Sequence, residues 1–378
     1  MHVVNDLLFV AFTPLLPLMA ADLSLSYAQV GAIKAAFSGA SSAFQVPAGI
    51  AAERFGEQVL LALGTGWVGL GILAVAAAPA FWLLLVAAAI GGLGGNFQHP
   101  IATAIISRLY EGRGRTTAIG TLNFTGDLGK VLAPLIAGGI AVVYGWRGAL
   151  VVVGAIGVAY ALLHLVAVPE PPGAARAIRT ADDGGIGWGI THRGGFMLLV
   201  TIGVLDSAAR GTSLTLIPFV LTAKDFTTAD IAAAFTALFA AGAAGKFLCG
   251  PIADRFGSVG AIVVTEVLTA AGIVATLFAP PDLAIVALLP LGFALNGTSS
   301  VLYASVSRFV DVRRRARGYG LYFTCTLLAS ALAPIAYGVV ADLGGLSLAM
   351  MVLAAATLLI APLAVSLRGP LAIAARAN

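Results

Sequence analysis

Gly49-Ile-Ala-Ala-Glu53-Arg54-Phe-Gly56 and Gly250-Pro-Ile-Ala-Asp254-Arg255-Phe-Gly257 are two copies of one pattern in this chain. They are separated by about 200 residues, and other features align at nearly the same offset. Asp6 meets Asp206 and Asn96 meets Asn296; further matched pairs are Pro17 and Pro218, Gly120 and Gly320, Pro134 and Pro334, and Gly138 and Gly338. The chain is therefore predicted to consist of two repeated halves.

The composition is that of a membrane protein. Of the 378 residues, 60% are hydrophobic and only 10% are charged, and the mean hydropathy is +1.00. A soluble domain carries about 25% charged residues, so a cytosolic enzyme, a nucleic-acid binder and a disordered scaffold are excluded. We predict an all-α membrane protein with twelve spans, because a bilayer requires about 20 apolar residues per helix. The predicted spans cover 2–21, 28–51, 59–78, 82–107, 115–143, 146–168, 196–221, 229–252, 258–279, 283–308, 317–341 and 345–367.

The long polar stretch 169–195 separates the two predicted halves, 1–168 and 196–378. Basic residues fix the expected orientation. With the amino terminus inside, inner loops and tails hold fifteen arginines, whereas the outer loops hold only Arg147 and Lys224. Such an excess favours cytoplasmic termini and a cytoplasmic linker. No cleavable signal peptide is expected, and from the repeat register we expect the first helix to begin upstream of Met1.

The paired pattern resembles the cytoplasmic gate motif of the major facilitator superfamily, and the resemblance extends over the whole chain. It implies a fold of two six-helix halves and a gate built from inner-loop residues. The residues so implied are Gly49, Glu53, Arg54, Gly250, Asp254, Arg255, Arg108 and Arg308, and Lys246 near the inner end of its helix is added to them.

Within that superfamily, two short motifs resemble the fosmidomycin-resistance group of exporters. They are His2-x-x-Asn5-Asp6 and Gly94-Gly95-Asn96-Phe97-Gln98-His99-Pro100. The stretch Gly120-x8-Gly129-x3-Ala133-Pro134-x2-Ala137-Gly138 is similar to the superfamily's antiporter motif, with alanine at two glycine positions. Both resemblances imply export, although small residues and a proline also serve helix packing.

Ionisable residues within spans are candidate functional groups, because a charge in hydrocarbon costs at least ~2.5–3.5 kcal/mol. Asp127 and Lys130 lie at i and i+3, and Asp206 and Arg210 lie at i and i+4, so each pair can neutralise itself or bind a proton or solute. Asp6 has no basic neighbour on its own helix. We therefore expect it to be protonated or paired with another helix, and it is the leading candidate for the proton carrier.

The remaining candidates for the substrate or proton site are polar groups at mid-depth, each of which could equally serve structure: Asn5, Lys34, Asn96, His99, Asn123 and Asn296. Glu266 and His164 fall on helices that the resemblance places at the periphery, and for them a structural role is favoured. Cys249 and Cys325 lie in apolar stretches and imply packing rather than a metal site.

These observations predict a secondary transporter that works by alternating access, driven by a proton gradient and without a bound cofactor or metal. Lys34, Lys130 and Arg210 favour a small anionic solute. The expected partners are that solute and the bilayer, with no nucleic acid, and the protein is expected to act as a monomer in a bacterial inner membrane. Proton-coupled uptake of an organic anion, a lipid flippase and a non-transporting sensor remain alternatives.

Overall fold

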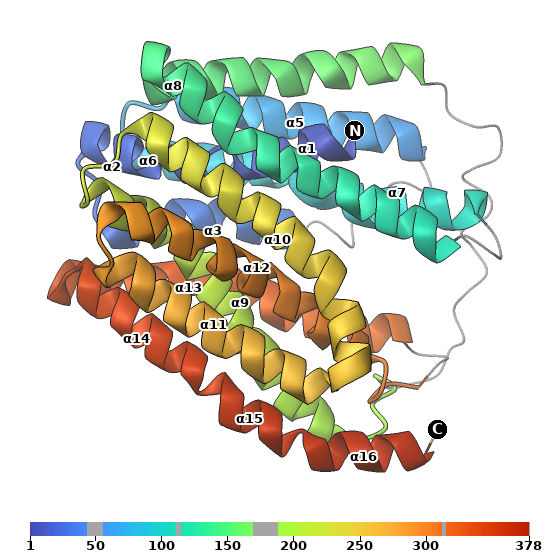
Figure 1. The fold of residues 1–378 in the computed structure, drawn as a ribbon. Coiled ribbons are helices and arrows are strands. Elements are labelled where there is room, and N and C mark those ends of the chain that lie inside the picture. Colours follow the sequence, from blue (N-terminus) through green and yellow to red (C-terminus); the bar gives the residue numbers. More distant parts are fainter. Residues whose placement is uncertain (44–55, 111–114, 169–187, 312–314, 378) are drawn as a thin grey trace. The chain divides into compact units, whose positions relative to one another are not determined.

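A computed structural model describes residues 1–43, 56–110, 115–168, 188–311 and 315–377 (Figure 1). These residues are helical almost throughout. Outside the helices, the described residues hold one isolated β-bridge, between Ile190 and Val310. The chain divides into two compact units, which are described separately. Unit 1 comprises Met1–Leu25, Ala32–Asp183 and Phe226–Thr236; unit 2 comprises Ser26–Gly31, Gly184–Asp225 and Ala237–Asn378.

The first and fourth predicted spans are interrupted helices. The first consists of α1 (His2–Val10), the 3₁₀ turn η1 (Thr13–Leu15) and α2 (Leu16–Leu23). Pro14 and Pro17 stand at the starts of η1 and α2, where a missing N–H costs least. The fourth consists of α6 (Phe81–Gly92), η2 (Gly95–Phe97) and α7 (Gln98–Leu109). The first of these breaks begins one to two turns beyond Asp6.

The other helices of unit 1 are longer. They are α5 (Glu57–Ala77) and α8 (Arg115–Ala167), and α3 (Tyr27–Ala43) contributes its residues from Ala32 onward. The helix α8 packs against both α1 and α5. It contains two predicted spans, which meet at a kink where the backbone of Gly145 is not helical. Pro134 lies inside its first half.

Unit 2 is built from α9 (Arg193–Thr222), α10 from Ala237 onward (Thr228–Phe256 in full), α11 (Ser258–Phe278), α12 (Pro281–Val306), α13 (Arg315–Gly344), α14 (Leu346–Leu358), α15 (Ile360–Ser366) and α16 (Arg368–Ala377). The closest pairs of helices are α9 with α13 and α11 with α12. A core of fully buried side chains, among them Phe196, Phe309 and Tyr322, joins α9, α13 and the end of α12.

A carboxylate caps the start of α3 within unit 2. The backbone N–H groups of Tyr27 and Ala28 donate to the two carboxylate oxygens of Asp342 on α13, at 2.8 and 3.0 Å. An anion is favoured at this position because the first N–H groups of a helix have no partner within the helix. Sequence reasoning did not identify this interaction, because the two partners are more than 300 residues apart.

Nine helices in the described part of the chain are long and apolar enough to span a membrane. One of them, Thr121–Ala167, is long enough to hold two spans. The predicted span 28–51 is described only as far as residue 43, and the predicted span 82–107 is divided among α6, η2 and α7. The all-helical membrane fold is thus confirmed, and the count of twelve spans stays a prediction.

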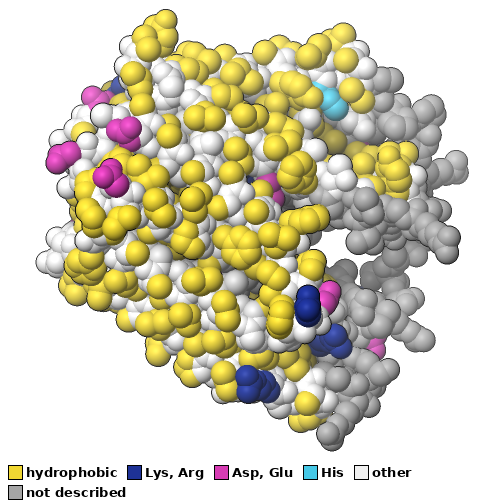
Figure 2. All heavy atoms as spheres, viewed as in Figure 1, with side chains coloured by type: hydrophobic (Ala, Val, Ile, Leu, Met, Phe, Trp, Pro, Cys, Tyr) yellow, Lys and Arg dark blue, Asp and Glu magenta, His cyan; other side chains and the backbone are white. Residues whose placement is uncertain are grey.

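The outside of these helices is apolar. Trp82, Val166, Phe247 and Leu343 expose 71–88% of their surface, although each would be buried in a soluble protein. Figure 2 shows hydrophobic side chains spread over most of the face in view, with few charged groups among them. A surface of this kind is suited to contact with the hydrocarbon of a lipid bilayer.

Equivalent glycines mark the turns of the repeat. Gly56 and Gly257, which close the two copies of the opening pattern, precede α5 and α11 with φ of +91° and +88°. Gly145 and Gly345 adopt φ of +68° and +87° at the last turns of the two halves. Their ψ angles lie between 139° and 176°, a region that only glycine occupies without strain. The repeat seen in the sequence is therefore present in the backbone.

Replacement of Gly145 by alanine should destabilise the protein by about 1–2 kcal/mol, because a Cβ is strained at this φ and ψ. Gly139→Ala in the same helix is the matched control. Gly139 lies in regular helix with open space around its Cα, so alanine should be neutral or stabilise by up to ~1 kcal/mol. Thermal unfolding of the two variants in detergent checks the contrast, and equal melting temperatures would contradict it.

Candidate functional site

Two carboxylates share one ammonium group in unit 1. Lys130 Nζ lies 3.0 Å from Asp6 Oδ2 and 3.1 Å from Asp127 Oδ1. The two aspartate side chains are only 4% and 10% exposed, whereas the lysine side chain is 27% exposed. The sequence left two options for Asp6, protonation or pairing with another helix. The structure contains the pairing. We call Asp6, Asp127 and Lys130 the first charge cluster.

Glycines bring α1 against α8 and so create this cluster. A Cβ on Gly126 would collide with the His2 ring and the Asp6 carboxylate, and one on Gly129 would collide with the carbonyl of Val3. Small residues allow such close backbone approach between membrane helices. In the stretch that resembles the antiporter motif, Gly129 therefore has a packing role that also places Asp6 beside Lys130.

Other polar groups surround the first charge cluster. His2 is 5% exposed and lies one turn before Asp6 on α1, so it is a further titratable group of this region. Asn5 is 1% exposed, and its Oδ1 atom has no hydrogen-bond donor among the described residues. A buried amide oxygen without a donor is rare, and it marks a place where a proton, water or solute group would be stabilised.

Unit 2 contains a second cluster at the position equivalent to Asp6. Arg210 Nη2 lies 3.6 Å from Asp206 Oδ2 and donates a hydrogen bond to Ser207 Oγ at 3.1 Å. The hydroxyl of Tyr303 is also close to the guanidinium. Both charged side chains are buried, at 4% exposure for the aspartate and 18% for the arginine.

Glu266 joins this cluster, which sequence reasoning missed. Its side chain is 1% exposed and lies close to the Asp206 carboxyl group. The family resemblance places this helix at the periphery, and the sequence gives the depth of Glu266 in the membrane but not the direction in which α11 presents it. We call Asp206, Arg210 and Glu266 the second charge cluster.

Lys34 differs from the other two candidate cations. It lies on α3 and is partly exposed, and no hydrogen bond or ion pair involves it in the described part of the chain. Lys130 and Arg210 are each engaged by carboxylates. The argument that unpaired cations attract an anion therefore applies to Lys34 and not to the other two.

The whole chain matches a known family. The family model of the Major Facilitator Superfamily matches residues 1–204 and again residues 199–375. The chain belongs to this superfamily. It is therefore a multi-pass membrane transporter of small solutes, and not an enzyme.

Individual relatives are more distant. The chain is 29% identical to the fosmidomycin resistance protein of Escherichia coli over 144 residues, which cover 38% of this chain and 35% of that protein. It is 26% identical to the uncharacterized MFS-type transporter YfnC of Bacillus subtilis over 93% of this chain and 87% of that one. It is 30% identical to the hexuronate transporter of B. subtilis over 41% of this chain and 37% of that one. The matched part thus spans about a third of the first and third of these relatives.

Solved superfamily structures have the same fold. A bacterial homolog of the human lysosomal transporter Spinster, in an inward-facing and occupied conformation, matches with a TM-score of 0.81 and 19% identity over 99% of this chain and 94% of that one. The nucleoside transporter NupG matches with a TM-score of 0.78 and 14% identity over 97% of each chain. At these identities, the likeness concerns the fold alone.

Several candidate residues of this superfamily member lie outside the described part of the structure. Gly49, Glu53 and Arg54 fall in an undescribed segment, and so do the side chains of Asn96, His99 and Arg108, whose backbone belongs to η2 and α7. Among the described candidates, Asn123 is exposed on α8. Asn296 on α12 donates to the carbonyl of Gly292 at 3.2 Å, an interaction within its own helix.

The second copy of the superfamily gate motif is visible at the end of α10. Asp254 and Arg255 are both exposed, and the Arg255 guanidinium lies 5.5 Å from the centre of the Phe256 ring. Lys246 is partly buried two to three turns earlier, and its carbonyl accepts a hydrogen bond from Ser300 at 3.2 Å. Gly250 has open space around it, and Arg308 is exposed after α12. The charged groups of this motif are thus available for contacts outside their own helix.

The two basic residues of the predicted outer loops have structural partners. Arg147 donates to the carbonyls of Ala76 and Ala78 at the end of α5, and its second amino group lies 3.0 Å from Asp22. Lys224 donates to the carbonyl of Ala279 at the end of α11, at 2.6 Å. In both units, a cation therefore satisfies carbonyl groups that a helix end leaves without partners.

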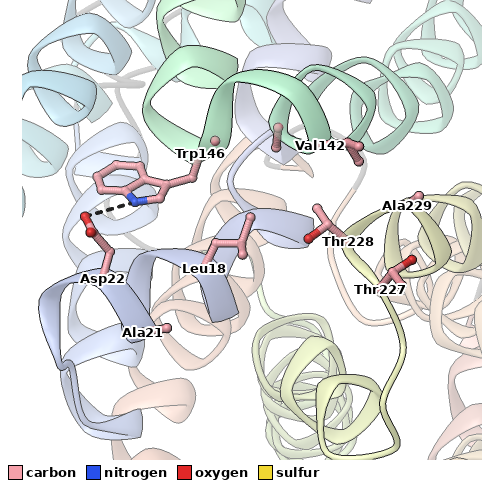
Figure 3. A pocket seen from close by; sticks show the side chains of 10 residues that line it. Leu18, Ala21, Asp22, Val142, Trp146, Thr227, Thr228 and Ala229 are labelled. Atoms are coloured by element: carbon pink, nitrogen blue, oxygen red, sulfur yellow. Dashed lines mark hydrogen bonds between the residues drawn. The ribbon is translucent and has the colours of Figure 1, made fainter.

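A pocket of about 760 Å³ lies in unit 1, and no residue of either charge cluster lines it (Figure 3). It is lined mainly by small and apolar groups, among them Leu18, Val142 and Ala229, and by Thr227 and Thr228. Its one carboxylate, Asp22, accepts a hydrogen bond from the Trp146 indole at 3.2 Å and pairs with Arg147. None of its described lining residues carries an unpaired charge, so we do not take it as the solute site.

Removal of the shared ammonium should be costly, and the cost should depend on pH. Lys130→Met leaves Asp6 and Asp127 buried and facing each other, so we expect a loss of about 3–5 kcal/mol in stability at neutral pH. The loss should be smaller at acidic pH, because protonation removes the uncompensated charges. Melting temperatures in detergent at several pH values measure this effect.

Lys130→Met combined with Asp127→Asn is the matched test of the first charge cluster. This double variant removes one carboxylate together with the cation, so it should recover a large part of the stability that the single variant loses. A double variant as unstable as Lys130→Met would show that the side chain of Lys130 matters for packing rather than for charge.

Proposed function

We propose that this protein is a proton-driven antiporter that exports a small organic anion. The observation that carries the proposal is the first charge cluster, in which two buried carboxylates share one ammonium group. With all three groups ionised, the first charge cluster carries a net charge of −1, and the effective penalty for a buried charge is several kcal/mol. Uptake of one proton removes this charge.

Asp6 is the proposed carrier of the transported proton. It is the more buried of the two carboxylates, and it lies one to two turns before the interruption between α1 and α2. Interrupted helices are a common feature of ion and substrate sites in secondary transporters. Lys130 keeps two partners, so it can remain paired with Asp127 when Asp6 is protonated.

Lys34 is the proposed binding partner of the solute. An ammonium group on a membrane helix, without an ion-pair partner among the described residues, attracts a counter-charge. Three relatives are associated with organic anions: the fosmidomycin resistance protein, the hexuronate transporter and a probable sulfoacetate transporter of Cupriavidus necator. A phosphonate, a carboxylate and a sulfonate share the negative charge that Lys34 would bind.

The direction of transport is proposed from the similarity to the fosmidomycin resistance protein and from the antiporter-like stretch of α8. We further propose that the chain is a monomer in a bacterial inner membrane with both termini inside, and that Asp254 and Arg255 hold the inner gate together with Glu53 and Arg54. Uptake by proton symport is the second candidate, because a hexuronate transporter is among the relatives.

Proton movement in liposomes distinguishes these candidates. Purified protein is reconstituted with a pH-sensitive dye inside, and fosmidomycin, a hexuronate or sulfoacetate is added outside. Entry of the solute should drive protons out under antiport and should carry protons in under symport. A flat response to all three anions, with and without a pH gradient, would instead favour a flippase or a sensor.

Asp6→Asn should abolish transport driven by a pH gradient while exchange of solute across the membrane without a gradient continues, because asparagine mimics the protonated acid. Asp282→Asn is the matched control, since Asp282 is an exposed aspartate at the start of α12. Uptake of labelled solute into liposomes measures both activities. Concentrative transport by Asp6→Asn under a pH difference would exclude Asp6 as the carrier.

Lys34→Gln should weaken binding of the anion by about 1.5–3 kcal/mol, the usual loss for a hydrogen bond to a charged group, which is roughly a 10- to 150-fold rise in Kd. Lys224→Gln is the control, because this lysine is occupied by the carbonyl of Ala279. Isothermal titration with the anion found active in liposomes gives both values. An unchanged affinity in Lys34→Gln would place the anion site elsewhere.

A further inference from the structure

Glu266 is a buried acid without a donor for either of its oxygens. Its residue is 1% exposed, and neither Oε1 nor Oε2 has a hydrogen-bond partner among the described residues. The Thr298 hydroxyl is near, but it already lies within hydrogen-bonding distance of Thr265 Oγ1 (2.7 Å) and the Ala294 carbonyl (3.1 Å). An ionised carboxylate in this position would be left unsatisfied, which is costly in a dehydrated interior.

The groups around Glu266 define its charge balance. From α9 it faces Asp206 and Arg210, and from α13 the hydroxyl of Tyr322 is close enough to interact with it. The facing segments of α14 and α15, Leu346–Ser366, contain no titratable residue. The Tyr322 side chain reaches α9 because Gly203 leaves no Cβ in its way. The local balance is therefore two carboxyl groups against one guanidinium.

We propose that Asp206 and Glu266 together form a second proton-binding site, in which the two carboxyl groups hold one proton between them beside Arg210. The proton converts one carboxylate to an acid, whose O–H then donates to the other carboxylate. This supplies the hydrogen bond that Glu266 lacks and leaves the cluster neutral. On release, the O–H bond breaks and the proton passes to water, with no other bond changed.

A role for this site in transport rests on the proposed proton coupling. The binding of the proton itself depends only on the groups of the second charge cluster. Each unit then has the same composition, with two carboxyl groups, one cation and room for one proton. The carboxyl groups come from different helices in the two units: Asp127 lies on α8 and Glu266 lies on α11.

Infrared spectroscopy of the purified protein tests the site without any solute. A protonated carboxyl group has a C=O absorption separate from that of a carboxylate, and it should be present in the parent protein at neutral pH. Glu266→Gln should lose the contribution of the second cluster and take up one proton fewer in a titration from alkaline to acidic pH. Asp230→Asn, which removes an exposed carboxylate, should leave this absorption unchanged.

Asp206→Asn separates a shared proton from an acid that is protonated on its own. Without Asp206, an ionised Glu266 balances Arg210, so the contribution of the second cluster should also disappear. It should return in the double variant Asp206→Asn with Arg210→Gln, where Glu266 has no cation. An Asp206→Asn variant that keeps the contribution of the second cluster, or a Glu266→Gln variant whose absorption equals that of the parent, would overturn the proposal. Asp206→Asn decides this even if Glu266→Gln does not fold.

Transport assays keep this proposal apart from the proposed function. If both hold, Asp6→Asn abolishes gradient-driven transport, and Glu266→Gln moves one proton fewer per solute in liposomes. If Asp6→Asn still concentrates solute while Glu266→Gln loses its absorption, the second site stands and the role of Asp6 falls. If the proton count per solute is equal in Glu266→Gln and the parent although its absorption is lost, the site binds a proton that transport does not use, and its part in coupling is overturned.

Discussion

The compensation of buried charge organises both units of this transporter. Lipid-facing helices exclude water from their interior, so each carboxylate there needs a cation, a proton or a set of donors. Unit 1 satisfies two carboxylates with one lysine, and unit 2 has one arginine beside two carboxyl groups. Gly126 and Gly129 allow α1 to approach α8, and Gly203 allows Tyr322 to approach α9. These close approaches bring the groups of the two clusters together.

Local spacing made part of the site predictable. Asp127 with Lys130 and Asp206 with Arg210 are pairs within single helices, and both are ion pairs in the structure. The contact of Asp6 with Lys130 depends on the packing of α1 on α8, so the sequence could indicate only that Asp6 needed a partner. The burial of Glu266 beside Asp206 was not predicted, because hydrophobic periodicity is weak in a helix that is apolar on all sides and the sequence does not show which face turns inward.

The fold was more predictable than the site. Span positions follow from hydropathy, and the repeat follows from matched glycines, prolines and acidic residues, all of which can be read along the chain. The interruptions in the first and fourth predicted spans and the capping of α3 by Asp342 were not predicted, because each depends on backbone geometry or on a distant partner. Membership in the superfamily then gives the class of function, while the solute depends on a few side chains such as Lys34.

The matched glycines Gly56 and Gly257, and Gly145 and Gly345, also bear on how such a protein can change. In descent from a duplicated ancestral segment, these turns admit almost no other residue, whereas the charged groups around the matched Asp6 and Asp206 already differ between the halves in identity and in helix. Mutation can therefore alter which solute or ion is bound without disturbing the connections that fold the chain. The glycine turns stay the same in the two halves, whereas the side chains between them can change.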